Sequence, residues 1–280
     1  MKILVIGDLH GEFPENVKEV INKEKIDLIL STGDFANFDN YRKIKFEKMD
    51  KTKFSNKVKD SVNNEDYNKM INEIIKSMEK PLEVLDSFNI PVYTIYGNLD
   101  YTNYEVNKHK IRTNSLNRIV KKSKNIKLFR EGYVDLGNLQ ILLFSGYRKN
   151  ALKYAPKKTK KVDRLNKGWR DRLNKIFSQI KPHKPVLFLF HDPPKDTKLD
   201  LINNPNSPMN GKHVGDEINR EFIEKYQPQV AVCGHMHETQ GTDQIGKSLI
   251  INAGYGRVGQ FLILDINGNN VKYDLRKWKN

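Results

Sequence analysis

Five short apolar runs, each followed by a polar residue able to bind a metal ion, constrain this chain of 280 residues more than any other feature. The runs cover residues 2–6, 28–30, 92–96, 186–190 and 230–233. Runs of this length, bounded by glycine and turn-forming residues, are typical of buried strands. A helical pattern opens at Pro14, between the first two runs, and continues to Lys25. This strand–helix–strand alternation predicts an α/β fold with a parallel sheet built from βαβ units.

The polar residues that follow these runs share one property, which is that each offers a nitrogen or oxygen ligand. They are Asp8 with His10, Asp34, Asn98, His191, and His235 with His237. In an open α/β sheet, ligands bind in the crevice at the carboxyl ends of the strands. We therefore expect all of these side chains at one edge of the sheet. A donor set without thiolates suits Mn, Fe, Zn or Co better than a closed structural zinc site.

Each of these motifs has a plainer interpretation when it is taken alone. Asp8 could serve the N-terminus of a helix, and Gly33-Asp34 and Gly97-Asn98 are common turn dipeptides. A lone histidine after a strand, such as His191, is more often a hydrogen-bonded structural residue. The joint pattern favours a metal site, because chance turns should not repeatedly leave ligand-type residues at strand ends.

Two long segments interrupt the alternation. Residues 37–80 are rich in Lys, Asn and Asp and carry apolar positions at helical spacing, which predicts a helical excursion. Residues 148–185 form a basic segment whose apolar positions suit one face of a helix. A Gly137-Asn138 turn predicts a β-hairpin on the N-terminal side of the basic segment. Three further strands are expected after residue 248. No repeat or linker marks a boundary, so we expect a single domain over residues 1–280.

The net charge of +15 is concentrated in the middle of the chain. Residues 101–185 carry 23 basic and 5 acidic side chains, whereas residues 1–100 carry 15 and 18, and residues 186–280 carry 11 of each. Such a segment can attract phosphate-rich partners, a nucleotide or nucleic acid among them. A solvated, lysine-rich surface explains the same composition equally well.

The composition also bears on the compartment. No apolar run approaches the ~18 residues of a membrane helix, and the N-terminal run is too short for a secretory signal. The single cysteine, Cys233, cannot form an internal disulfide, which fits a reducing compartment. We therefore expect a cytoplasmic protein without a membrane partner. Because Cys233 lies within an expected buried strand, a cysteine-phosphatase mechanism is disfavoured.

The ordered motifs resemble those of the calcineurin-like metallophosphoesterase superfamily. They are Asp8-Leu9-His10, Gly33-Asp34, Gly97-Asn98-Leu99-Asp100, His191 and Gly234-His235-Met236-His237. This resemblance spans residues 8–237 and therefore most of the chain. It implies a four-layer αββα sandwich, in which two mixed β-sheets are flanked by helices, with a dinuclear metal site at the strand ends.

The resemblance also implies a role for each motif residue. Asp8, His10 and His237 would bind the first metal, Asn98, His191 and His235 the second, and Asp34 would bridge both. Asp34, Asn98 and Asp100 are the predicted catalytic residues. Manganese is the favoured metal, with Fe, Zn, Co or Ni as alternatives. Two such ions lower the pKa of a shared water and neutralise the phosphoester, so the expected reaction is in-line attack by a metal-bridging hydroxide.

Leu99 departs from the family pattern. Many members have a histidine at this position, where it is thought to assist the leaving group or bind phosphate, and leucine can do neither. We therefore predict a metal-dependent phosphoesterase that prefers phosphodiesters or activated esters to monoesters. The alternative is a nucleic-acid or nucleotide-binding regulatory module with a vestigial metal site. No protein partner is predicted.

Overall fold

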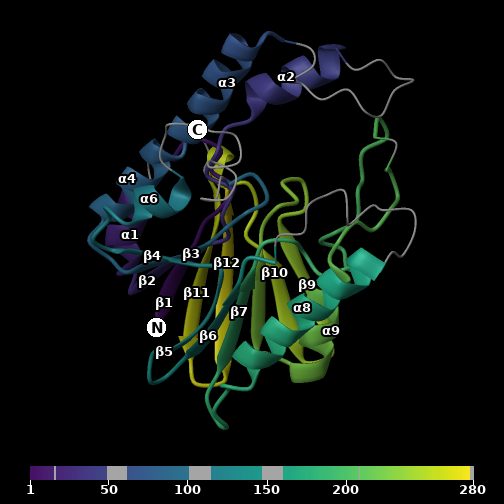
Figure 1. Ribbon diagram of the computed structural model, residues 1–280. Coiled ribbons are helices and arrows are strands. Elements are labelled where there is room, and N and C mark those ends of the chain that lie inside the picture. The colour runs from purple at the N-terminus through teal and green to yellow at the C-terminus, as the bar shows by residue number, and fades with distance from the viewer. Residues whose placement is uncertain (16, 49–61, 101–114, 147–159, 208, 278–280) are drawn as a thin grey trace.

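A computed structural model describes residues 1–15, 17–48, 62–100, 115–146, 160–207 and 209–277. Its centre is a pair of mixed β-sheets that face each other (Figure 1). The first sheet has the order β12-β11-β1-β2-β3-β4. Its strands are β1 (Lys2–Val5), β2 (Leu28–Ser31), β3 (Val92–Ile95), β4 (Ile126–Phe129), β11 (Gln260–Asn267) and β12 (Asn270–Lys277). Strands β1 to β4 are parallel, and β11 and β12 are antiparallel to their neighbours.

The second sheet repeats this plan, with the order β5-β6-β7-β8-β10-β9. Its strands are β5 (Glu131–Asp135), β6 (Gln140–Phe144), β7 (Val186–Phe190), β8 (Val230–Cys233), β9 (Gly241–Ile245) and β10 (Ser248–Asn252). Strands β6, β7, β8 and β10 are parallel, while the edge strands β5 and β9 are antiparallel. Both sheets therefore contain the parallel core that the strand–helix alternation predicts.

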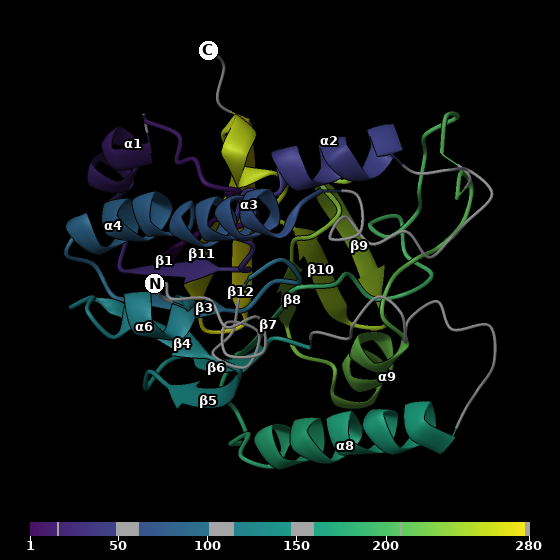
Figure 2. The same cartoon turned by 45° about the horizontal axis from the view of Figure 1, so that its top comes forward.

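Helices form the two outer layers (Figures 1 and 2). The helices packed with the first sheet are α1 (Val17–Glu24), α2 (Asp39–Lys48), α3 (Asn64–Lys76), α4 (Glu79–Ser87) and α6 (Leu116–Val120). The second sheet is covered by α8 (Lys160–Phe177) and α9 (Glu217–Tyr226). A short 3₁₀ turn, η2 (Gly256–Val258), precedes β11. The four-layer αββα sandwich is thus confirmed.

Alternation along the strands explains how the layers are held together. In β1, Ile3 and Val5 point between the sheets, whereas Leu4 points to the helices, and all three are fully buried. Successive residues of a strand face opposite sides, so an unbroken apolar run supplies two cores at once. On the outer face of the second sheet, Phe188 and Phe222 lie in a third apolar cluster with the helices. Each such side chain contributes roughly 1.5–3 kcal/mol on burial.

The two segments that interrupt the alternation are partly described. The excursion expected over residues 37–80 contains α2 and α3, and residues 49–61 lie outside the described part. In the basic segment α8 forms as expected, while residues 147–159 lie outside. The break between α3 and α4 lies before Pro81, which is in the first turn of α4, where its missing N–H would have no helical acceptor.

Among the described residues, no helix is both long enough and apolar enough to cross a membrane.

Candidate metal centre

The predicted ligand residues all lie directly beyond the carboxyl ends of strands, but the strands belong to two sheets. Those from the first sheet are Asp8 and His10 after β1, Asp34 after β2 and Asn98 after β3. Those from the second are His191 after β7, with His235 and His237 after β8. The expectation of a single sheet edge is therefore wrong. The ligands meet where the carboxyl edges of two facing sheets come together.

Four of these residues have a backbone conformation that is rare for any residue but glycine. The φ angle is 53° at Asp8, 45° at His10, 60° at Asp34 and 68° at His235. Such left-handed conformations cost roughly 1–3 kcal/mol each and persist only where the surroundings hold them. Here the loops hold one another, since the N–H of Asp8 donates to Gly33 O at 2.8 Å and that of His10 to Asp34 O at 3.1 Å.

Glycines let these loops approach closely. A Cβ atom added to Gly97 would overlap the carboxylate and the backbone nitrogen of Asp34. One added to Gly234 would overlap the carboxylate of Asp8 and the side chain of Thr32. The glycines of the Gly-Asn and Gly-His motifs are thus required by close packing against the ligand residues.

The first ligand group consists of Asp8, His10 and His237, whose ligand atoms all lie within 4.8 Å of one another. Nε2 of His10 is 3.1 Å from Nε2 of His237, which in turn is 3.4 Å from Oδ1 of Asp8. The other ring nitrogen of His10 faces the carbonyl oxygen of Ala36 at 3.0 Å and so donates to it. In the neutral imidazole this leaves a lone pair on Nε2, facing the other two ligands.

The second group consists of Asp34, His191 and His235, again within 4.8 Å. The side-chain oxygen of Asn98 joins them, at 2.9 Å from Nε2 of His191 and 2.7 Å from Nδ1 of His235. Nε2 of His191 is 3.4 Å from Oδ2 of Asp34, and its Nδ1 donates to the carbonyl oxygen of Thr32 at 2.8 Å. All the ligands predicted for the second metal are therefore close together.

Both groups bring acceptor atoms face to face. In the first group two imidazole nitrogens and a carboxylate oxygen converge, and in the second an amide oxygen, two imidazoles and a carboxylate do so. The lone pairs of these atoms repel one another unless a proton or a metal cation lies among them, and a metal cation can be bound by all of them at once. Two divalent metal ions with nitrogen and oxygen ligands fit this donor set.

The electrostatics of the second group agree with that fit. Burial disfavours a charged imidazole at His191, but the carboxylates of Asp34, Asp8 and Asp192 together outweigh burial and raise the pKa of His191 to about 10. Burial raises the pKa of Asp34, yet His191, His10 and the backbone N–H of Leu99 together outweigh burial, so this pKa falls below its usual range. The site thus favours a negative Asp34 and an added positive charge beside it.

Asp100 has different contacts from the other predicted site residues. Its carboxylate accepts three backbone hydrogen bonds, from Asp34 at 2.9 Å, Phe35 at 2.7 Å and Gly97 at 2.9 Å. Burial and the neighbouring Asp34 carboxylate raise the pKa of Asp100 to about 7 in spite of these bonds. Asp100 therefore ties the loop after β2 to the loop after β3 and acts on the backbone that carries Asp34.

Sequence reasoning missed two side chains that contact the ligands. Oδ1 of Asp192 lies 3.3 Å from Nε2 of His235, and a carboxylate in this position orients a metal-binding histidine. Asp192 directly follows His191, so a search for carboxylates beside the ligands could have found it. The ring of Tyr255 stacks on the ring of His237 with the centroids 4.0 Å apart. The sequence around Tyr255 carries no signal for that contact.

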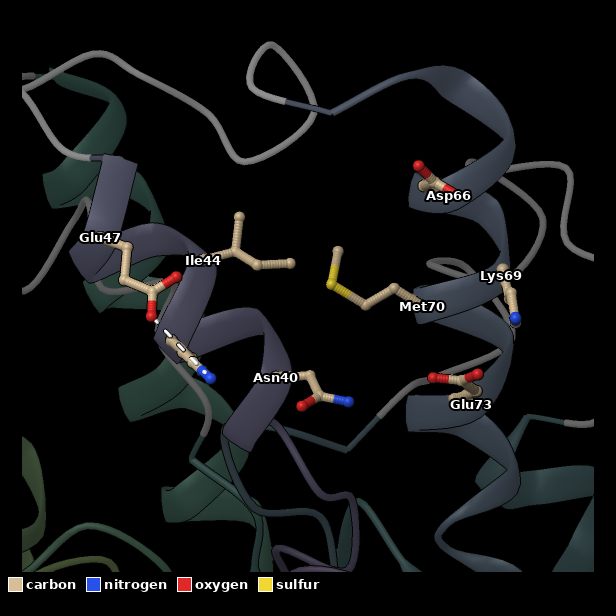
Figure 3. A pocket seen from close by; sticks show the side chains of 8 residues that line it. Asn40, Ile44, Glu47, Asp66, Lys69, Met70 and Glu73 are labelled. Atoms are coloured by element: carbon tan, nitrogen blue, oxygen red, sulfur yellow. Dashed lines mark ion pairs between the residues drawn. The ribbon is translucent and has the colours of Figure 1, made fainter.

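A separate cavity of about 410 Å³ lies between α2 and α3. Ile44 and Met70 point toward each other across it, with charged side chains such as Glu47 and Glu73 around them (Figure 3). None of the predicted metal ligands lines this cavity. It belongs to the helical excursion and is distinct from the metal centre.

Comparisons with known proteins agree with the fold and the ligand pattern. The uncharacterized protein MJ1162 of Methanocaldococcus jannaschii is 25% identical over 256 residues, which cover 90% of this chain and 87% of that protein. One crystal structure covers 98% of both chains with a TM-score of 0.65 at 17% identity. The match to the structure of purple acid phosphatase PPD1 of yellow lupin (Lupinus luteus) covers 99% of this chain and 51% of the phosphatase chain, with a TM-score of 0.52 at 14% identity.

These structural likenesses show the fold, and a family model shows the family. The model described as calcineurin-like phosphoesterase matches residues 1–239, a range that contains every predicted ligand. The chain therefore belongs to the calcineurin-like phosphoesterase family, whose members are metal-dependent hydrolases.

Proposed function

We propose that this protein hydrolyses phosphodiesters with the help of two divalent metal ions, manganese being the favoured metal. The observation that carries the proposal is the pair of adjacent ligand groups, in which acceptor atoms converge from two sheets. Asp8, His10 and His237 would hold one ion, Asn98, His191 and His235 the other, and Asp34 would contact both. When bound, two such ions lower the pKa of a water molecule and neutralise charge on the phosphoester.

The residues of the chain supply orientation and a hydrogen-bond donor. The backbone N–H of Leu99 donates to Oδ1 of Asp34 at 2.7 Å, which fixes the direction of that carboxylate. Asn98 directs its oxygen to His191 and His235, so its amide hydrogens are left to donate to a phosphate oxygen. We assign Asp100 to positioning, because its contacts are with the backbone of the site.

The preference for diesters rests on Leu99. A phosphomonoester with a poor leaving group needs a proton donor at the leaving oxygen, and an aliphatic side chain cannot provide one. A diester with a good leaving group has less need of that proton. The half-buried Leu99 side chain also adds an apolar surface beside Asn98.

The test compares phenyl phosphate and p-nitrophenyl phosphate, which are monoesters with a poor and a good leaving group, with bis-p-nitrophenyl phosphate, each with Mn²⁺ and purified protein. We expect the highest kcat/KM on the diester and the lowest on phenyl phosphate, and loss of all three activities in the Asp34→Ala and His235→Ala variants. His213→Ala is the matched control, since this histidine lies outside both ligand groups and pairs with Asp200. Faster turnover of either monoester would contradict the diester preference. Absence of metal-dependent turnover on any ester would favour the regulatory-module alternative.

A second feature favours nucleic acid as the diester. Between residues 118 and 130 the chain has six exposed basic side chains and no acidic one, namely Arg118, Lys121, Lys122, Lys124, Lys127 and Arg130. Among the described residues these side chains form no ion pair. The carboxylates of the adjacent strand β5 are themselves neutralised, Glu131 by Arg172 at 3.6 Å and Asp135 by Lys181 at 2.7 Å. This surface along β4, which we term the basic edge, would attract a polyanion.

Salt dependence tests the basic edge. Binding of a single-stranded oligonucleotide should weaken linearly with the logarithm of the salt concentration, with a slope of about −0.7 per phosphate contact. Replacing Lys121, Lys122 and Lys124 with glutamine should reduce that slope by about 2. The matched control replaces Lys43, Lys69 and Lys76 of the helical excursion and should leave the slope unchanged. A response to salt that is flat in the wild type would exclude nucleic acid as the partner.

A further inference from the structure

The four histidines of the metal centre are not held in the same way. In three of them an oxygen faces the ring nitrogen that points away from the ligands. These pairs are His10 with Ala36 O at 3.0 Å, His191 with Thr32 O at 2.8 Å and His235 with Asp192 Oδ1 at 3.3 Å. Such partners fix the tautomer and orientation of a metal-binding imidazole. In His237, Nε2 points toward His10 and Asp8, and in the described part of the chain no hydrogen-bond partner faces Nδ1.

An aromatic ring takes the place of that oxygen. The ring of Tyr255 lies parallel to the ring of His237, with an interplanar angle of 3° and the centroids 4.0 Å apart. The same tyrosine meets His10 edge-on, at 5.7 Å and 65°. Tyr255 therefore contacts both histidines of the first ligand group.

The stacking geometry favours a metal-bound His237 over a free one. Two neutral, electron-rich rings prefer offset or edge-to-face arrangements with centroids 4.5–7 Å apart. A metal ion withdraws electrons from the imidazole that binds it, so close parallel stacking on a phenol ring becomes more attractive, as in a cation–π pair. The contact with Tyr255 thus stabilises the liganded imidazole more than the free one.

Tyr255 is itself fixed relative to the ligand loops. Its backbone N–H donates to the side-chain oxygen of Gln260 at 2.7 Å. The two residues after it donate to the loop that carries Asp8, Gly256 to Gly7 O at 3.0 Å and Arg257 to Asp8 O at 3.2 Å. The tyrosine is therefore anchored to the backbone of the first ligand group.

We propose that Tyr255 is a positioning residue that orients His237 by ring stacking and raises the metal affinity of the first ligand group. The inference rests on the proposed function, because it requires that this group binds a metal ion. In the described part of the chain, Tyr255 stacks on no residue of the second ligand group. We therefore expect the metal affinity of the second group to be independent of Tyr255.

Isothermal titration of the metal-free protein with Mn²⁺ tests the inference without any assay of activity. Two backgrounds separate the groups, because His191→Ala disables the second and His10→Ala disables the first. Adding Tyr255→Leu to the His191→Ala background should weaken Mn²⁺ binding about 10- to 100-fold. Adding it to the His10→Ala background should change nothing. Tyr255→Phe, which keeps the ring, should restore most of the affinity.

Two controls make a failure interpretable. Tyr273→Leu removes an exposed tyrosine from β12 and should leave both affinities unchanged. Thermal unfolding of each metal-free variant establishes that it is folded. The inference would be overturned if Tyr255→Leu left the Mn²⁺ affinity unchanged in the His191→Ala background. It would also be overturned if Tyr255→Leu lowered the affinity equally in both backgrounds. In either case the proposed function would stand. A wild-type protein that binds no Mn²⁺ would overturn the proposed function, and the inference with it.

Discussion

The glycine of the Gly97-Asn98 motif offers a sharp test of how the ligand loops are packed. An added Cβ at this position would overlap Oδ1, Cγ and the backbone nitrogen of Asp34. The loop cannot simply withdraw, because the N–H of Gly97 is bonded to Asp100 and that of Leu99 to Asp34. The Gly97→Ala substitution must therefore move the Asp34 loop and its carboxylate.

The size of the effect follows from this crowding. Overpacking a tightly packed site costs typically 1–3 kcal/mol, and a chain of this size loses about 2–4 °C in Tm per kcal/mol. We therefore expect Gly97→Ala to lower Tm by roughly 2–12 °C. A misplacement of about 1 Å at a reacting centre can cost ~100-fold in rate, so metal-dependent diesterase activity should fall by about that factor at 25 °C.

Gly168→Ala is the matched control. Gly168 lies in α8, and apart from its chain neighbours and the helix's own backbone no atom of the described residues lies within 4 Å of the Cβ that alanine would add. Alanine is favoured over glycine within a helix by roughly 0.5–1 kcal/mol, so this variant should be slightly more stable and fully active. Differential scanning calorimetry gives Tm, and initial rates on bis-p-nitrophenyl phosphate give activity. If Gly97→Ala matched the wild type in both, the packing argument around Asp34 would be refuted.

Three further predictions concern catalysis, the core and metal binding. Leu99→His should raise kcat/KM on phenyl phosphate, whose leaving group is poor, relative to bis-p-nitrophenyl phosphate by at least about tenfold, and an unchanged ratio would remove Leu99 as the cause of the preference. Phe222→Ala, which removes a buried ring that packs against both Phe177 and Tyr226, should cost about 3–5 kcal/mol of unfolding free energy by denaturant titration. A cost under about 1 kcal/mol would contradict the packing. Mn²⁺ at 100 times its Kd should stabilise the metal-free protein by about 2.7 kcal/mol, whereas an unchanged Tm would argue against binding.

The strands that the sequence predicts are those whose signal is strong and local. The runs that become β1, β2, β3, β7 and β8 are apolar on both faces, because each of these strands lies inside a sheet. Of the four edge strands, β5 and β12 are predicted, each beside a turn that joins it to an apolar neighbour, whereas β4 and β9 are not. In β4 an exposed Lys127 interrupts the pattern, and β9 is largely polar. An edge strand needs little apolar character, so its sequence resembles that of a loop.

The candidate site shows the same division between local and distant information. The strand-end positions of Asp8, Asp34 and His191 follow from local pattern, and the family motifs add the pairing of ligands. The assignment of strands to two sheets depends on pairing between distant segments, which no local pattern encodes. The contact of Tyr255 with His237 depends in the same way on η2 bonding to the loop after β1.

Crystals grown with Mn²⁺ would test the two-metal account most directly, through anomalous scattering at the manganese edge. We predict two anomalous peaks ~3.5–4 Å apart, with Asp34 in contact with both. One should lie among Asp8, His10 and His237, and the other among Asn98, His191 and His235. A single peak, or a second ion that Asp34 does not reach, would contradict the account.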